Sequence, residues 1–406
     1  LVETMPQAVF RRDLEGRFTF VNQPYCKYHK VRPEDILGKT DFDLYPKASA
    51  EKFWADDLRV MRDGETMDII EVSRPVGAEE TKYHHVIKSP LRDASGEIIG
   101  LQGMFWDITD MRLAEERIRR AHEELAASQE KLRVKNVQME DDLKMAREIQ
   151  LTMLPQQFPV FPPEATPADS AFQFTYRYNP TGSVGGDFFT VTALSGTEVA
   201  VFICDVAGHG VRSALVTAMI RALVEEMKPL AGEPGAFLTK LNSDLGTILK
   251  HAGAPILTTA FYLVANASTG VMRFANAGHP KPLLVRRSSG RVETLKGAAK
   301  ASQPALALFD QANYVTSEVA LAPTDLVMLF TDGLYEVQST DQALYSQEML
   351  ASAVQKREKL PTPELFDKLL AEVRTFASEQ DFADDVCMVG VEFSRLIPPP
   401  PASPSI

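Results

Sequence analysis

Residues 198–210, EVAVFICDVAGHG, decide how the C-terminal half of the chain folds. The first seven are rich in valine, isoleucine, phenylalanine and cysteine, which is typical of a buried strand. Asp205 ends this run, and the turn residues 207–210 follow it, so its carboxylate is expected at a cleft rather than in the core. The apolar spacing of three and four residues over 211–230 predicts a helix. Together these features predict a functional site.

Composition limits the partners of the chain. With 406 residues, 45% of them hydrophobic, we expect two or three domains with real cores. The formal charge of −12 argues against a general affinity for nucleic acid or anionic membrane. No uncharged run approaches the length of about 18 residues that crosses a bilayer. We therefore expect a cytoplasmic protein, and because the chain begins at Leu1, a piece of something longer.

The three cysteines lie far apart in the sequence, at Cys26, Cys204 and Cys387. Two of them fall inside apparent buried strands. This pattern indicates small core residues in a reducing compartment rather than a disulfide or a zinc site.

Residues 1–109 alternate strand and helix patterns. Strands are expected at 8–13, 16–22, 67–74, 81–91 and 97–109, with a turn at GAEE (77–80) and a helix over 48–63 that ends at Gly64. In GRFTFVN, GKTDFDLYP and IIGLQGMFWDITDMRLAEE the region resembles a PAS domain, which implies a small antiparallel sheet with an unknown ligand or none. His29, His84 or His85 as haem ligands is the weaker reading, because adjacent histidines in a strand point to opposite faces. A role in dimerisation and signal relay is preferred.

Residues 110–154 predict one long helix, because glycine and proline vanish while charge density rises. One stripe repeats every seven residues with apolar side chains, whereas the second stripe of the heptad is mostly polar. This predicts a weak two-stranded coiled coil, with a solitary helix on a neighbour as the alternative. The two stripes are Met111, Ile118, Leu125, Leu132, Met139, Ala146 and Met153, and Glu115, His122, Gln129, Asn136, Leu143 and Gln150. A proline-rich linker is expected at 155–169 and a disordered tail at 396–406.

Four acidic motifs punctuate residues 170–395. Each borders small residues and a strongly apolar strand, and they contain Asp187, Asp205, Asp332 and the pair Asp384/Asp385. Any one alone reads as a solvated loop or a helix cap. Carboxylates gathered at one end of a sheet repel one another unless cations neutralise them, and oxygen ligands suit Mg²⁺ or Mn²⁺. Two such ions about 4 Å apart can activate a water against a phosphoryl group.

In sequence order, GGDFF, DVAGHG, AGHP, TDGLYE and DDV, together with KMAREIQLTMLP before them, are similar to the PPM family of serine/threonine protein phosphatases in its SpoIIE/RsbU branch. The resemblance implies an α-β-β-α sandwich, and thus an α+β chain. It also implies that Asp205 bridges two metals and that the Val206 carbonyl binds one of them. The other would be held by Asp187, Asp332 and one of Asp384 and Asp385, with Asp384 preferred.

Two histidines follow strands in the same region, and one of the motifs resembles that of a second enzyme family. His209 either donates a proton to the departing serine oxygen or shapes the turn, and both readings stay open. His279 is expected to be structural or to line the substrate lip. GGDFF also looks like the GGDEF signature of diguanylate cyclases, but Phe188 replaces its acidic residue and the other motifs would be unexplained.

These observations predict a PAS-regulated, metal-dependent serine/threonine phosphatase that forms a homodimer through the PAS domain and residues 110–154. The resemblance implies a phosphorylated STAS-type anti-sigma-factor antagonist as substrate. The alternative is a catalytically silent module that binds the antagonist without hydrolysis.

Overall fold

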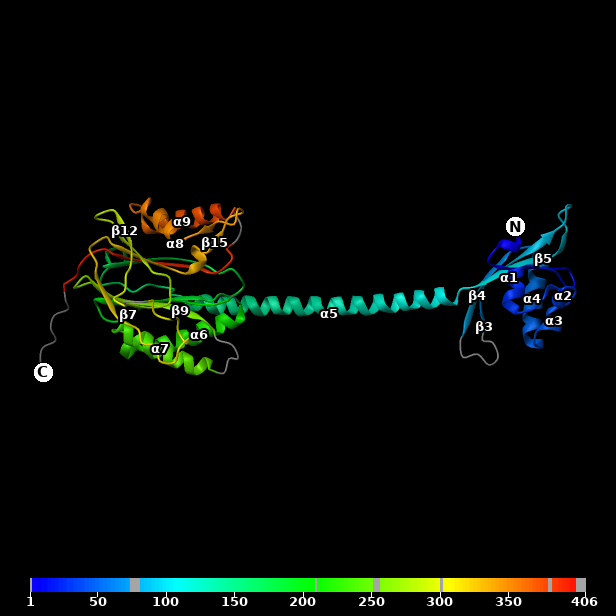
Figure 1. The fold of residues 1–406 in the computed structure, drawn as a ribbon, viewed down its shortest axis with the longest axis horizontal. Helices are drawn as coiled ribbons and strands as arrows, with labels where there is room; N and C mark the ends of the chain where they lie inside the picture. Colours follow the sequence, from blue (N-terminus) through cyan, green and yellow to red (C-terminus); the bar gives the residue numbers. More distant parts are fainter. Residues whose placement is uncertain are drawn as a thin grey trace. The chain divides into compact units, whose positions relative to one another are not determined.

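The computed structural model describes residues 2–73, 81–208, 210–250, 256–299, 302–378 and 382–398. The chain divides into two compact units, Leu1–Lys135 and Asn136–Ile406. The division falls inside the long helix α5 (Thr109–Met153), which continues from one unit into the other (Figure 1). Within the described ranges, no helix combines the length and the apolar character that crossing a membrane requires.

The N-terminal unit is a five-stranded antiparallel sheet with helices inserted between its second and third strands, as predicted. The strand order is β2-β1-β5-β4-β3. Its strands are β1 (Ala8–Arg12), β2 (Phe18–Val21), β3 (Met67–Ser73), β4 (Lys82–Arg92) and β5 (Ile98–Asp107), and its helices are η1 (Val2–Thr4), α1 (Gln23–His29), α2 (Pro33–Ile36), α3 (Asp41–Leu44) and α4 (Lys47–Asp63). Helix α4 ends at Gly64, whose φ of 69° is the left-handed conformation that glycine adopts without strain. The turn expected at 77–80 lies outside the described residues.

Inside this unit, four charged side chains are buried together. Arg12 donates from Nη2 to Oδ1 of Asp41 at 2.7 Å and also pairs with Asp57. Lys88 donates to Oδ1 of Asp57 at 2.7 Å. None of the four is more than 5% exposed. Two positive and two negative charges therefore balance, which buried ions require.

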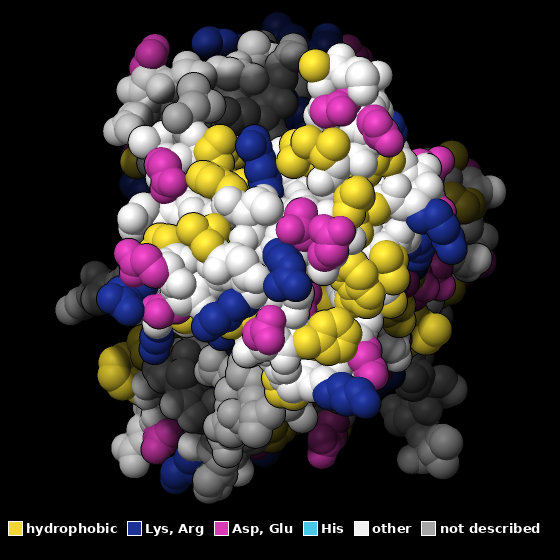
Figure 2. Space-filling view, turned by 90° about the vertical axis from the view of Figure 1, so that its right-hand side faces the viewer, with side chains coloured by type: hydrophobic (Ala, Val, Ile, Leu, Met, Phe, Trp, Pro, Cys, Tyr) yellow, Lys and Arg dark blue, Asp and Glu magenta, His cyan; other side chains and the backbone are white. Residues whose placement is uncertain are grey.

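On the face seen in Figure 2, hydrophobic side chains lie among charged side chains of both signs.

The three histidines considered as haem ligands do not share one face. His84 is buried and contacts the hydroxyl of Tyr28, and its ring also lies against Phe105. His85 points the other way, toward Asp68. The prediction of opposite faces for His84 and His85 is confirmed. His29 also contacts the Phe105 ring, and burial lowers its pKa to about 4.

Helix α5 runs for 45 residues, all of them described, and is almost entirely exposed to solvent. The apolar stripe with a seven-residue spacing is open along it: Ile118, Leu125 and Leu132 are 56–58% exposed. Gln150, one of the polar heptad positions, is the single buried residue of this helix.

The C-terminal unit is a sandwich of two five-stranded antiparallel sheets with a helix pair on each outer face, so the predicted α-β-β-α architecture is confirmed (Figure 1). Helices α6 and α7 pack on the sheet β13-β10-β9-β8-β7, and α8 and α9 on the sheet β12-β11-β14-β17-β6. The strands are β6 (Phe172–Asn179), β7 (Asp187–Ala193), β8 (Glu198–Val206), β9 (Thr258–Asn266), β10 (Val271–Ala277), β11 (Leu283–Arg286), β12 (Arg291–Thr294), β13 (Ser317–Ala320), β14 (Leu326–Phe330) and β17 (Val386–Phe393), with a small pair β15 (Val337–Gln338) and β16 (Leu344–Tyr345). The helices are α6 (Val211–Glu226), α7 (Pro234–Leu249), α8 (Gln347–Gln355) and α9 (Thr362–Phe376), with single turns η2 (Pro167–Asp169), η3 (Lys228–Leu230) and η4 (Asp332–Leu334).

The segments predicted as a linker (155–169) and as a disordered tail (396–406) both contain residues that pack against the core. Phe161, in the proline-rich stretch, is fully buried, and its amide donates to Oγ of Ser170 at 3.0 Å. Ile397, in the expected tail, is 5% exposed and belongs to the same core cluster. Residues 399–406 lie outside the described part of the chain.

The helix predicted over 211–230 ends earlier, at Glu226. The chain then forms the single turn η3, where Pro229 lacks an amide to extend the α-helix.

Candidate active site

Two of the acidic residues face each other across neighbouring strands. In the antiparallel pair β7 and β8, Asp187 at the start of β7 lies opposite Asp205 near the end of β8. Residues directly opposite in such a pair have Cβ atoms about 4.5–5.5 Å apart, so like charges there repel. Asp187 is 2% exposed, whereas Asp205 is only partly buried. The two carboxylates come together because Asp187 begins β7 and Asp205 lies near the end of β8, its antiparallel neighbour.

The second sheet supplies the other carboxylates from the loops at one end of β14 and β17. These strands are paired, with Phe330 opposite Met388. Asp332 lies in η4, directly after β14, and Asp384 and Asp385 directly precede β17. Because the strands are antiparallel, the end of one and the start of the other lie at the same edge. The paired strands thus place these three acids together.

Thr331 joins the two sheets at this edge. Its hydroxyl donates to Oδ2 of Asp187 at 2.7 Å and accepts the backbone amide of Cys387 at 2.9 Å. Thr331 is fully buried. The bond fixes the orientation of the Asp187 carboxylate from the opposite sheet.

The electrostatics show that the acids interact. Burial, followed by the charge of Asp205, raises the pKa of Asp187 well above its ordinary value. Burial, followed by the charges of Asp332 and Asp384, raises the pKa of Asp205 to about 8. Burial and the charge of Asp384 also raise the pKa of Asp332. The fold therefore holds these carboxyl groups close enough to raise one another's pKa values.

The adjacent acids Asp384 and Asp385 have different environments. Asp385 is buried and accepts three hydrogen bonds, from the amide and hydroxyl of Thr181 at 2.7 and 2.9 Å and from the amide of Gly186 at 2.5 Å. Asp384 is exposed, and its Oδ1 accepts the amide of Asp385 at 2.8 Å. Both carboxylate oxygens of Asp385 thus accept hydrogen bonds from the protein, whereas the charge of the exposed Asp384 raises the pKa values of Asp205 and Asp332.

The glycines of the 183–189 motif allow this turn to approach its neighbours. A Cβ at Gly185 would lie 2.4 Å from Oδ2 of Asp385, and one at Gly186 would lie 2.3 Å from the carbonyl oxygen of Val206. The Val206 amide in turn donates to the Gly186 carbonyl at 3.2 Å. Only glycine fits at both positions.

Comparison with known proteins tests the two family resemblances of the sequence. Residues 195–394 match the family model "Stage II sporulation protein E (SpoIIE)", and residues 2–113 match the model "PAS fold". The chain joins a PAS domain to a SpoIIE-family domain. The two resemblances stated from the sequence are therefore confirmed.

Individual relatives extend the likeness. The phosphoserine phosphatase RsbP of Bacillus subtilis is 24% identical over 252 residues, which are 62% of this chain and 57% of RsbP. The phosphoserine phosphatase RsbU of the same organism is 22% identical over 266 residues, or 63% of this chain and 73% of RsbU. The SiaA-PP2C domain of Pseudomonas aeruginosa has the same fold, with a TM-score of 0.54, 23% identity, and coverage of 64% of this chain and 98% of that domain. The chain spans just over half the length of RsbP.

The donor set of the SpoIIE-family domain fits divalent cations in its chemistry. The acids supply hard oxygen atoms whose mutual repulsion a cation would relieve. As the side chains stand, however, no group of three or more His, Cys, Asp or Glu residues in the described ranges is arranged to hold a metal ion. The raised pKa values of Asp205 and Asp332 are the electrostatic sign of this repulsion.

The two histidines differ in what the structure says of them. His209 lies outside the described residues. His279 is 4% exposed, and its Nδ1 lies 2.8 Å from the hydroxyl of Thr259. Burial lowers the pKa of His279 to about 3, so its ring is neutral at physiological pH. A structural role fits this position better than a substrate lip.

The sequence motifs do not predict two positioning residues. Thr331 stands inside the TDGLYE motif without a role of its own, although it orients Asp187. Thr181 received no role, although it supplies two of the three bonds to Asp385. The polar residues that flank the acidic motifs were the available signal, but the motif order alone does not pair them.

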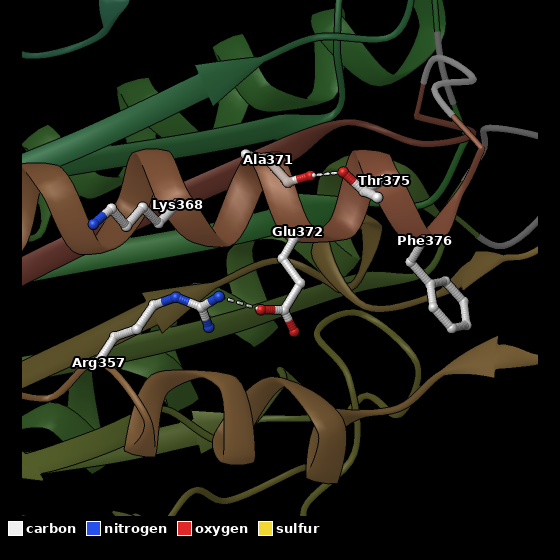
Figure 3. A pocket seen from close by; sticks show the side chains of 6 residues that line it. All are labelled: Arg357, Lys368, Ala371, Glu372, Thr375 and Phe376. Atoms are coloured by element: carbon white, nitrogen blue, oxygen red, sulfur yellow. Dashed lines mark hydrogen bonds and ion pairs between the residues drawn. The ribbon is translucent and has the colours of Figure 1, made fainter.

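A pocket of about 520 Å³ in the same unit lies away from these acids. It is lined by residues of α9 and by Arg357 from the segment after α8 (Figure 3). Arg357 pairs with Glu372 at 2.5 Å across it. None of the predicted site residues lines this pocket, so size alone does not identify the site.

Proposed function

We propose that the SpoIIE-family domain is a metal-dependent phosphatase that hydrolyses phosphoserine or phosphothreonine on a protein. One observation carries the proposal: Asp187 and Asp205 from one sheet meet Asp332 and Asp384 from the loops of the other. Burying like charges together costs free energy unless cations bind between them. A site for two divalent ions explains why the chain accepts this cost, and the likeness to the phosphoserine phosphatases RsbP and RsbU supports the same chemistry.

The proposed roles follow the resemblance of the motifs to the family. Asp205 would bind both Mn²⁺ or Mg²⁺ ions, with the carbonyl of Val206 on one of them. Asp187, Asp332 and Asp384 would hold the other, while Asp385 holds the loop. Divalent ions bound here would lower the pKa of a water and neutralise phosphoryl charge.

The chain's own residues prepare this site. Thr331 orients Asp187 by its hydrogen bond. Because the pKa values of Asp205 and Asp332 are raised, metal binding is expected to compete with protons. His209 next to the turn is the candidate to protonate the departing serine oxygen, and a change in the pH profile of His209→Gln would separate this role from a turn-shaping one.

For the substrate, we propose a phosphorylated STAS-type anti-sigma-factor antagonist. This proposal rests on the family resemblance of the sequence motifs. The PAS domain would regulate the phosphatase, and its ligand is not assigned.

We also propose that the chain acts as a homodimer through the PAS domain and residues 110–154. The support is the apolar stripe of α5, whose side chains at Ile118, Leu125 and Leu132 are more than half exposed. Apolar residues spaced by seven along an exposed helix are buried when a second helix packs against them. The polar second stripe makes this pairing weak.

A second candidate function is a silent module that binds the antagonist without hydrolysing it. The observation in its favour is that, in the part of the chain that the structure describes, no three of these acids are arranged to hold a metal ion. The clustering of four carboxylates argues against it, since a binding surface gains nothing from their repulsion.

The deciding experiment measures turnover of p-nitrophenyl phosphate and of a phosphorylated STAS antagonist with and without Mn²⁺. We expect Mn²⁺-dependent release of phosphate from both, and its loss in Asp205→Ala. Absence of turnover in the wild type, or equal turnover in Asp205→Ala, would favour the silent binding module.

A further inference from the structure

Gln150 of α5 grips the backbone of the metal-site turn. Its Nε2 donates to the carbonyl of Gly185 at 2.7 Å, and its Oε1 accepts the amide of the same glycine at 2.9 Å. The side chain is 7% exposed, on a helix whose other residues are not buried. A primary amide that bonds both the backbone N–H and the backbone carbonyl of one residue fixes the position and the orientation of that residue.

The gripped glycine lies beside the groups that shape the site. The next residue, Gly186, donates to Oδ2 of Asp385 at 2.5 Å, and its carbonyl accepts the amide of Val206 at 3.2 Å. On the other side of Gly185, the carbonyl of Val184 accepts the amide of Gly210 at 3.2 Å. Asp187 is two residues further on. The turn therefore touches both the DVAGHG segment and the acidic pair.

The turn has little room to adjust by itself. The position for a Cβ at Gly185 is 2.4 Å from Asp385, and the position at Gly186 is 2.3 Å from Val206. A displacement of Gly185 therefore has to move Asp385 or Val206 as well. Leu154, the residue after the end of this helix, is buried in the sandwich core, so the helix end is anchored both at Gln150 and just beyond its last residue.

We propose that Gln150 is a positioning residue that couples the end of α5 to the metal site, by holding Gly185 where Gly186 and Asp187 can complete it. The proposal rests on the proposed function and deepens it, because it names the contact through which the long helix would regulate metal binding. A shift or rotation of α5 that withdrew Gln150 would release the turn and weaken the site. Gln150 thus serves the site, rather than the polar stripe of a coiled coil.

The test compares Gln150→Met with Gln138→Met in the full chain. Methionine keeps the length and helix propensity of glutamine but makes neither hydrogen bond, and Gln138 is exposed on the same helix. Mn²⁺ binding is measured by calorimetry, and turnover of p-nitrophenyl phosphate is measured against Mn²⁺ concentration. Because each lost bond is worth only a few-fold, we expect Gln150→Met to need roughly tenfold more Mn²⁺ for half-saturation. Turnover at saturating Mn²⁺ should stay within about threefold of wild type, since no bond to the reacting groups is lost.

A second readout does not depend on activity. Amide hydrogen exchange of residues 183–187 should be faster in Gln150→Met and unchanged in Gln138→Met, because the Gly185 amide loses its acceptor. If Gln150→Met does not fold, Gln150→Glu retains the acceptor for that amide and should shift the Mn²⁺ midpoint in the same direction.

The outcomes separate the two proposals. Mn²⁺ binding and exchange that match between Gln150→Met and Gln138→Met would overturn the role of Gln150, even if the wild type is an active phosphatase. A wild type that binds Mn²⁺ without turnover would refute the phosphatase, while the Mn²⁺ midpoints would still decide the role of Gln150. A wild type that binds no Mn²⁺ would overturn both.

Discussion

Replacing Asp384 and Asp385 one at a time should separate metal binding from loop stability. Asp385→Ala removes three hydrogen bonds and leaves the buried amide of Gly186 without its partner. At about 1 kcal/mol net for each bond, the free energy of unfolding should fall by about 3 kcal/mol. For a unit of this size, that lowers the melting temperature by about 10 °C. Asp384→Ala removes only one bond at an exposed position and should cost about 1 kcal/mol or less.

The assay can follow the two units separately. Both tryptophans, Trp54 and Trp106, belong to the PAS domain, so their fluorescence reports its unfolding and serves as an internal control. Far-UV circular dichroism in EDTA reports both units. We expect Asp385→Ala to lower the C-terminal transition only, and Asp384→Ala to abolish Mn²⁺-dependent turnover while leaving both transitions in place. Wild-type turnover in Asp384→Ala, or an unshifted melt in Asp385→Ala, would refute this division of roles.

Three further predictions follow from the same structure. Gly186→Ala, whose Cβ would lie 2.3 Å from the Val206 carbonyl, should lose most turnover and several degrees of melting temperature, whereas Gly182→Ala, with 3.7 Å to its nearest neighbour, should behave as wild type in both assays. Because the pKa of folded His279 is about 3, the unfolded state binds more protons below pH 6.5, so the free energy of unfolding should fall by up to about 1.4 kcal/mol for each unit of decreasing pH. Urea titrations at pH 6.5 and 5 should show a smaller loss of stability in His279→Gln than in the wild type. An equal loss in both proteins would contradict the buried neutral ring. Leu125→Asp with Leu132→Asp should convert a dimer into a monomer by light scattering, while Gln138→Asp on the same helix should not; a dimer that survives the double change would remove α5 from the interface.

The sequence predicted those parts of the fold whose signal is local. Asp205 and Asp332 were placed at strand ends because the apolar runs before them are short, continuous and followed by turn residues. The end of α4 at Gly64 was predicted because glycine commonly ends a helix in the left-handed conformation. Such patterns depend on neighbouring residues only, and the structure confirms them.

The remaining contacts depend on partners far away in the chain. Thr331 orients a carboxylate 144 residues earlier, and Gln150 binds a glycine 35 residues later. Gln150 also illustrates a false reading, since a polar residue in a heptad resembles a weak coiled-coil position until its partner is known. Phe161 was assigned to a linker because prolines surround it, yet its ring fills the core. Periodicity does not reveal which distant group satisfies a polar side chain.

The division of the acids between two layers has a mechanical consequence. Asp187 and Asp205 belong to one sheet and Asp332 follows a strand of the other, and in the described residues the hydroxyl of Thr331 links the two sheets at this edge. An ion bound among these acids would cross-link the two sheets. Chelation should then let the layers slip at this end, so that the sandwich opens from the site outward while its far end stays closed.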